Sequence, residues 1–235
     1  MTHPESYAQH QQPTDHTRSR RATLGLRGTA AVSTFALPAS VRGDRRTEYF
    51  EPATYSVVDV DGESPPFSRA TQLYDAYVYD PDEPETAALL TPDGHSVTWD
   101  RFSDVNGSVT LECFPKGTRV TLYGWDLIPR GLYTVWVAIL DGDTVVGSAP
   151  LGANDGSQSA FRASGGGRGD LSVLDLPGPL TADLNDDPAY ETYVTPTCLL
   201  DSEFAVEIAG AYHYDDVTHG AEPRPNAVEH FSVLF

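Results

Sequence analysis

Histidine and aspartate side chains gather near the end of the chain. The segment AYHYDDVTHG, residues 211–220, holds His213, Asp215 and His219, and His230 follows in the last apolar run. Imidazole nitrogens together with a carboxylate oxygen are donors that suit Zn²⁺ or Cu²⁺. This pattern predicts a divalent transition-metal site formed by His213, His219, His230 and Asp215.

Two strand-like runs must position these residues. Apolar residues alternate in the segment 204–208, which places His213 on the opposite face if the two-residue period of a strand persists. The last run, residues 227–235, leaves His230 opposite its own apolar face. Antiparallel pairing with coincident apolar faces allows His213 to lie across from His230, with Cβ atoms about 5 Å apart. A bulge at residues 209–211 would shift this register.

The same segment has a purely structural interpretation. Asp215 and Thr218 are ordinary turn-capping residues, and Gly220 permits a positive φ after the turn. Histidines at a strand end commonly hydrogen-bond to a carbonyl or a carboxylate. A capped turn therefore stays open as an alternative, and so does a histidine-based site for a small molecule or a proton.

Other chemistries are poorly supported. Cys113 is followed by Phe-Pro-Lys and Met1 is the only methionine, which argues against a blue-copper site. The acidic stretch at residues 59–64 begins like a calcium loop, but Ala70 stands where the bidentate acid belongs. No Gly-x-Ser-x-Gly elbow occurs. The sequence therefore does not predict a specific enzymatic reaction.

The surrounding pattern is that of an all-β protein. From residue 96 onward, short β-branched and aromatic runs are separated by Asn-Gly, Lys-Gly and Asp-Gly-Asp turns. This predicts an antiparallel β-sandwich, jelly-roll or immunoglobulin-like, over residues 91–235. The run at 132–139 is apolar on both faces, as in a central strand. Residues 47–90 are expected to form a Pro-, Tyr- and Asp-rich extension packing on the sandwich, and residues 1–46 a disordered tail.

The charge composition of the chain argues against some binding partners and indicates the solvent to which the protein is adapted. The chain has 15 Lys and Arg against 34 Asp and Glu, a net charge of −19, and Lys116 is its only lysine. Such a surface repels phosphate backbones and anionic lipids, so nucleic-acid binding is not expected. A carboxylate-rich, lysine-poor surface favours a halophilic origin. An acidic mesophilic protein is the alternative.

The N-terminal tail and the two cysteines indicate the cellular compartment of the protein. Ser19-Arg20-Arg21 with Leu24, followed by a mildly apolar run to Ala39, predicts a twin-arginine export signal and an extracellular or cell-surface location. A disordered basic tail is the alternative. No run is long and apolar enough to predict a transmembrane helix. The only two cysteines, Cys113 and Cys198, are expected either to form one disulfide or to stay two buried thiols.

Four stretches carry a family resemblance. GTRVTLYGWDLIPRGLYTVWV (117–137), with DGHSVTWDRF before it and YHYDDVTHG and VEHFSVLF after it, resembles an uncharacterised group of exported β-sandwich proteins of halophilic archaea and some bacteria. That group shares Gly-Thr-x-Val, then Leu-x-Pro-x-Gly-x-Tyr-Thr-Val-Trp, then His-x-Asp-x-x-Thr-His-Gly. The resemblance covers residues ~90–235. It implies an exported β-sandwich and supplies no activity.

Three functions are consistent with these observations. The leading hypothesis is an exported protein that binds a divalent transition metal and an extracellular or cell-surface ligand. The alternative is a structural or carbohydrate-binding module without metal, in which aromatic side chains form a stacking platform. A histidine-metal enzyme is third. The side chains that could form such a platform are the three tryptophans and the tyrosines of the extension: Trp99, Trp125, Trp136, Tyr74, Tyr77 and Tyr79.

Overall fold

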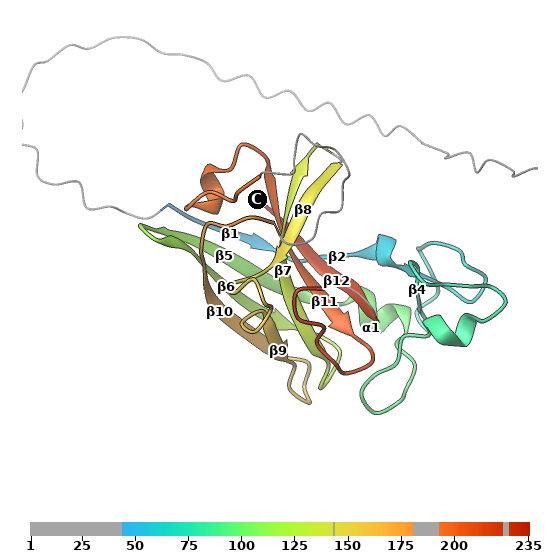
Figure 1. Ribbon diagram of the computed structural model, residues 1–235. Helices are drawn as coiled ribbons and strands as arrows, with labels where there is room; N and C mark the ends of the chain where they lie inside the picture. The colour runs from blue at the N-terminus through green and yellow to red at the C-terminus, as the bar shows by residue number, and fades with distance from the viewer. Residues whose placement is uncertain (1–43, 143, 181–192, 223–225) are drawn as a thin grey trace, which may run out of the picture. The chain divides into compact units, whose positions relative to one another are not determined.

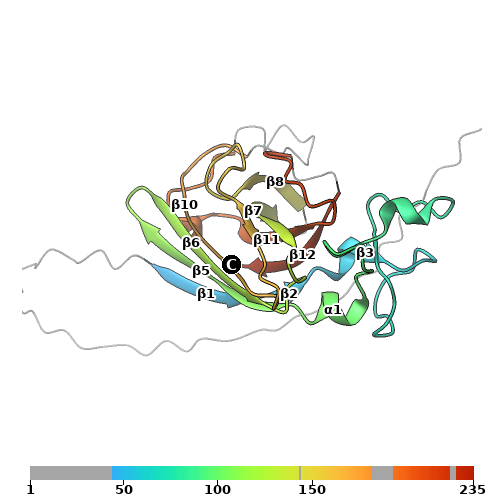
Figure 2. The ribbon, with the colours of Figure 1, turned by 90° about the horizontal axis from the view of Figure 1, so that it is seen from below.

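Two antiparallel β-sheets form the body of the protein (Figures 1 and 2). The structure, a computed structural model, describes residues 44–142, 144–180, 193–222 and 226–235. Sheet A has the order β1-β5-β6-β10, and sheet B has the order β2-β12-β11-β7-β8 with β9 pairing with β7. The strands of sheet A are β1 (Arg45–Tyr49), β5 (Asn106–Phe114), β6 (Gly117–Trp125) and β10 (Gly169–Asp175). The strands of sheet B are β2 (Glu51–Pro52), β7 (Leu132–Asp141), β8 (Thr144–Pro150), β9 (Ala160–Arg162), β11 (Ala205–His213) and β12 (Ala227–Leu234).

The core lies between the two sheets, and strand alternation builds it. Val109 and Leu111 of β5 and Val120 and Leu122 of β6 occupy buried inward positions, and the residues that alternate with them are more exposed. β7 is buried on both faces over most of its length, which confirms the prediction of a central strand. The all-β antiparallel sandwich is likewise confirmed. Fully buried members of the core include Val109, Leu111, Leu122, Val135, Ile139, Ile208 and Phe231.

The sandwich begins earlier than residue 91. β1 is an edge strand of sheet A and β2 pairs with β12 in sheet B, so residues 45–52 belong to the sandwich sheets. The predicted boundary between an extension at 47–90 and the sandwich therefore does not follow the sheets. Within the predicted extension, the residues after β2 lie outside these two sheets, in the segment between β2 and β5. It contains η1 (Thr54–Ser56), β3 (Val57–Val58), β4 (Tyr74–Asp75), η2 (Pro84–Ala87) and α1 (Trp99–Ser103). The predicted disordered tail falls almost entirely on residues 1–43, outside the described residues.

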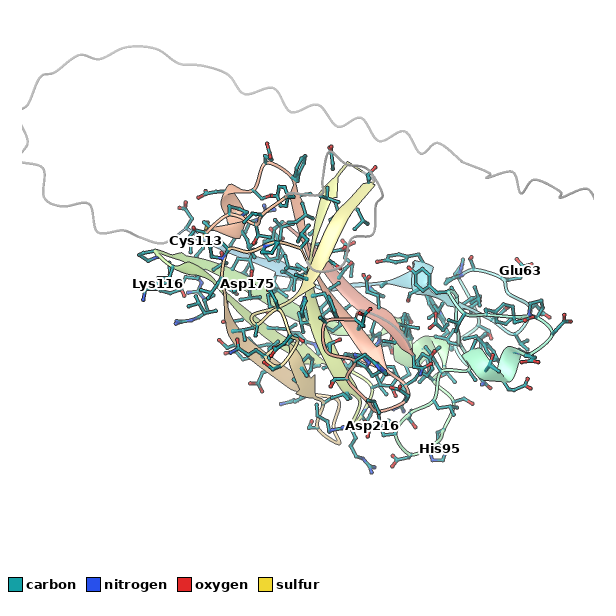
Figure 3. All side chains as sticks on the ribbon, in the orientation of Figure 1. Glu63, His95, Cys113, Lys116, Asp175 and Asp216 are labelled. Carbon is teal, nitrogen blue, oxygen red and sulfur yellow. A yellow bond between two sulfur atoms is a disulfide. The ribbon has the colours of Figure 1, made fainter. Side chains whose placement is uncertain are left out.

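Cys113 and Cys198 form a disulfide, the first of the two alternatives that the sequence left open. Their Cα atoms are 5.1 Å apart. Cys113, labelled in Figure 3, lies near the end of β5, and Cys198 directly precedes η3 (Leu199–Asp201). The Thr118 hydroxyl also accepts the Leu199 amide at 2.8 Å, which ties this segment to β6. None of the helices in the described parts of the chain has the length and apolar character to span a membrane.

Candidate metal site

A bulge between β11 and β12 decides where the histidines point. Gly210 pairs with Phe231 and Ala211 pairs with Glu229, so His230 is an extra residue on β12. A Cβ on Gly210 would lie 2.0 Å from the Phe231 ring, so only glycine leaves room for that ring to pack over β11 here. The prediction that His213 lies across from His230 is therefore wrong. His213 pairs with Ala227 instead.

His230 is buried in the core, and both of its ring nitrogens are used. Nδ1 lies 2.8 Å from the Tyr133 hydroxyl, and Nε2 lies 2.9 Å from the Phe102 carbonyl oxygen. Because the Tyr133 oxygen accepts the Ile128 amide at 2.9 Å, its own proton goes to Nδ1, and Nε2–H donates to Phe102. Burial lowers the pKa of His230 to about 4, so the ring stays neutral. His230 is thus a structural residue and does not join the predicted metal cluster.

His213 ends β11 on the outer face of sheet B and has one unused nitrogen. It is 1% exposed. Its Nε2 lies 2.8 Å from Thr134 Oγ1, which also accepts the Trp136 indole N–H at 2.9 Å. Its Nδ1 is the one buried side-chain nitrogen or oxygen without a hydrogen-bond partner in the described part of the chain. A buried polar atom left in this way costs about 1–3 kcal/mol, so it calls for an explanation.

The turn after β11 brings two more donors close to His213. Asp215 Oδ1 accepts the Val217 amide at 3.0 Å, and Oδ2 lies 3.0 Å from His219 Nε2. The Asn226 amide also donates to Oδ2, at 3.2 Å. One ligand atom from each of His213, Asp215 and His219 lies within 4.8 Å of the other two. The structure thus brings together three of the four predicted ligands.

The protonation states favour a cation. Burial lowers the pKa of His213 to about 4, and the neighbouring Asp215 carboxylate only partly opposes this shift. Partial burial acts to raise the pKa of Asp215, but hydrogen bonds from Val217, Asn226 and His219 outweigh it and hold that pKa below its ordinary value. At neutral pH the cluster therefore offers a neutral imidazole and a carboxylate, the forms that bind metal ions.

The turn is held in place by neighbouring loops. Gly156, at φ +76°, packs so closely that an added Cβ would lie 2.2 Å from the Gly220 carbonyl oxygen. Arg162 of β9 forms an ion pair with Asp216 and also donates to the Arg130 carbonyl at 2.9 Å. Asp216, labelled in Figure 3, marks the end of sheet B where the cluster lies. These contacts fix the loop that carries His219.

Thr134 and Trp136 support the cluster, and sequence reasoning did not connect them with it. Their alternation on β7 places both on one face, yet the pairing of β7 with β11 was needed to set them beside His213. Asn226 was missed as well, because a residue eleven positions from Asp215 gives no local signal.

Comparisons with known proteins add no assignment. No family model, no curated protein and no solved structure matches this chain. The resemblance to exported proteins of halophiles therefore stays a prediction, and the function has to be argued from the site.

Proposed function

We propose that this protein binds one divalent transition-metal ion through His213, Asp215 and His219, and that the ion is Zn²⁺. The observation that carries the proposal is the buried, unpartnered Nδ1 of His213. A bound cation would supply the missing partner and remove the cost of burying that nitrogen alone. The donor atoms of Asp215 and His219 lie within 4.8 Å of each other and of a ring nitrogen of His213. A capped turn alone does not require this arrangement.

The surroundings of His213 suit a metal ligand. When Nε2 carries the proton and donates to Thr134 Oγ1, Nδ1 keeps a lone pair for the ion. Thr134 is in turn held by Trp136, so the ring orientation is fixed before an ion arrives. Two imidazoles and one carboxylate are donors for Zn²⁺, and Cu²⁺ accepts the same set. Three protein donors leave a coordination position for water or an external ligand.

The proposal places this site in an exported protein. The disulfide between Cys113 and Cys198 supports export, because such bonds persist in oxidising compartments and are rare in the cytosol. The Ser19-Arg20-Arg21 pattern supports it from the sequence side, although it lies outside the described residues. The acidic surface supports function in a salty medium.

A calorimetric titration tests the metal proposal. Untagged protein freed of metal with EDTA is titrated with Zn²⁺ and then with Cu²⁺, and one equivalent is expected to bind. His213→Ala should weaken Zn²⁺ binding by at least about 100-fold, since the loss of an outer-shell partner alone costs 10- to 100-fold. His95→Ala removes an exposed histidine outside the cluster and serves as the control. Equal affinity of His213→Ala and the parent protein would contradict the proposal.

Gly156→Ala probes the loop packing that holds His219. The added methyl group would clash with the Gly220 carbonyl and would sit at a positive φ, so we expect the turn to shift and Zn²⁺ affinity to fall about tenfold. Gly94→Ala is a matched control, because Gly94 has φ +78° and no atom within 4 Å of its added Cβ. Both variants carry the same backbone strain, so a similar loss of affinity in both would show that the loop contact is irrelevant.

A further inference from the structure

Large aromatic side chains lie in solvent on the outer face of sheet A. Tyr123 is 57% exposed and Trp125 is 39% exposed, and both occupy outward positions of β6. Tyr49 on the edge strand β1 is 69% exposed. Their inward neighbours on β6, Leu122 and Gly124, are buried. β1, β5 and β6 lie side by side in sheet A (Figure 2), and the register of these strands places the three rings on one face of that sheet.

The strand register puts the rings in a regular arrangement. Tyr49 pairs with Ser108, Ser108 pairs with Tyr123, and Tyr123 pairs with Asp170, so one row crosses all four strands. Tyr49 and Tyr123 are two strands apart, about 10 Å along the row, and Trp125 lies about 7 Å further along β6. The next row carries only hydroxyl side chains. It is formed by Thr47, Thr110, Thr121 and Ser172.

A shallow hollow adjoins two of the rings. It has a volume of about 660 Å³, and its lining includes Tyr123, Trp125, Ser164, Arg168 and Asp170. Within the described residues, no hydrogen bond or ion pair engages the guanidinium of Arg168 or the carboxylate of Asp170. The hollow thus presents aromatic faces beside a hydrogen-bond donor and an acceptor of opposite charge that no described residue engages.

We propose that this face, the aromatic platform of Tyr49, Tyr123 and Trp125, binds a neutral polysaccharide. A sugar ring has an apolar face of C–H groups that packs on an aromatic ring, and a rim of hydroxyls that donate and accept hydrogen bonds. Arg168 supplies donors and Asp170 supplies acceptors for such a rim, and charged partners make the stronger hydrogen bonds. Their charges cancel, and the net charge of −19 disfavours an acidic polysaccharide.

A polysaccharide fits this surface better than a folded protein does. A stable protein interface buries about 800 Å² on each partner around an apolar core. Here a full row of hydroxyls borders the row of Tyr49 and Tyr123, and Arg168 and Asp170 line the hollow beside Tyr123 and Trp125. A narrow ridge with polar borders matches an extended chain of sugar rings.

Affinity electrophoresis in EDTA tests the platform without the metal site. Native gels containing cellulose derivatives, xylan, mixed-linkage glucan, mannan, soluble starch or glycol chitin are run beside gels without polysaccharide. Retardation by at least one of these neutral polymers is expected. Calorimetry with the matching hexasaccharide then gives the affinity. Tyr123→Ala and Trp125→Ala should each weaken binding about tenfold or more, as buried aromatic anchors do. Tyr77→Ala, at an exposed tyrosine outside sheet A, is the control and should bind like the parent protein.

Two outcomes overturn the proposal. One is that no polymer of the panel retards the parent protein. The other is retardation that the Tyr123→Ala, Trp125→Ala double variant retains. Circular dichroism confirms that the variants are folded, and if the double variant is not, Tyr49→Ala and Asp170→Ala carry the same test. Sedimentation velocity shows whether the platform instead joins two copies of the chain, because a dimer lost in the double variant would also overturn the proposal.

Discussion

Unfolding a Cys113→Ser, Cys198→Ser variant is expected to require about 4–5 kcal/mol less free energy than unfolding the parent protein, because the disulfide closes a loop across a sequence separation of 85. Without the bond, the unfolded chain keeps the loop-closure entropy that the disulfide removes, and folding has to overcome it. The bond also joins the end of β5 to the segment before β11, the strand that carries His213. Its loss is therefore expected to affect both sheets.

Urea unfolding, monitored by tryptophan fluorescence, measures this difference in free energy. The parent protein in excess reductant is the matched control and should unfold at the same urea concentration as the double serine variant. If the oxidised protein and the variant differ by less than about 1 kcal/mol, the disulfide does not constrain the unfolded chain as the chain-entropy model requires.

Acidification is expected to destabilise the protein through His230. The folded protein holds the pKa of His230 at about 4, while the unfolded chain restores the ordinary value of 6.5. Between those values the unfolded state binds the proton more tightly, so the contribution of His230 to stability is complete above pH 6.5 and is lost as the pH falls to 4. A shift of that size corresponds to about 3 kcal/mol. His213, with its pKa also lowered to about 4, should add a loss of the same sign.

His230→Gln isolates this contribution. The variant should be less stable at pH 7, because it loses the ring contacts with Phe102 and Tyr133. Its free energy of unfolding should nevertheless fall less steeply between pH 6.5 and pH 4 than that of the parent protein, measured in EDTA. His95→Gln, at an exposed histidine, should keep the parent slope. If His230→Gln keeps that slope as well, His230 does not stay neutral in the folded protein.

Strand alternation made much of this fold predictable from the sequence. The runs at β5, β6, β7, β11 and β12 repeat with a period of two, and turn dipeptides separate them. The apolar character of both faces of β7 correctly indicated a central strand. The short strands β1 and β2 were not recognised, because five and two residues beside a charged, proline-containing segment carry too little pattern.

The candidate site was predictable only in part, and one glycine explains the error. Parity along β11 correctly put His213 opposite the apolar residues of its strand, and the metal-site hypothesis grouped Asp215 and His219 with it, as the structure does. The register of β12 depended on how the Phe231 ring packs over Gly210, a tertiary contact that inserts His230 as an extra residue. The sequence indicated that a bulge there would matter, but it contained no signal that one occurs.

Long-range ¹H–¹⁵N correlation spectra of the histidine rings during a Zn²⁺ titration, recorded at neutral pH on metal-free protein, give the most direct test of the metal site. One equivalent of Zn²⁺ should move the ring nitrogen signals of His213 and His219 and leave those of His230 unchanged, since both nitrogens of His230 are held by Tyr133 and Phe102. Unchanged signals of His213 and His219 at one equivalent, or a shift of exposed His95 in their place, would show that these residues do not hold the ion.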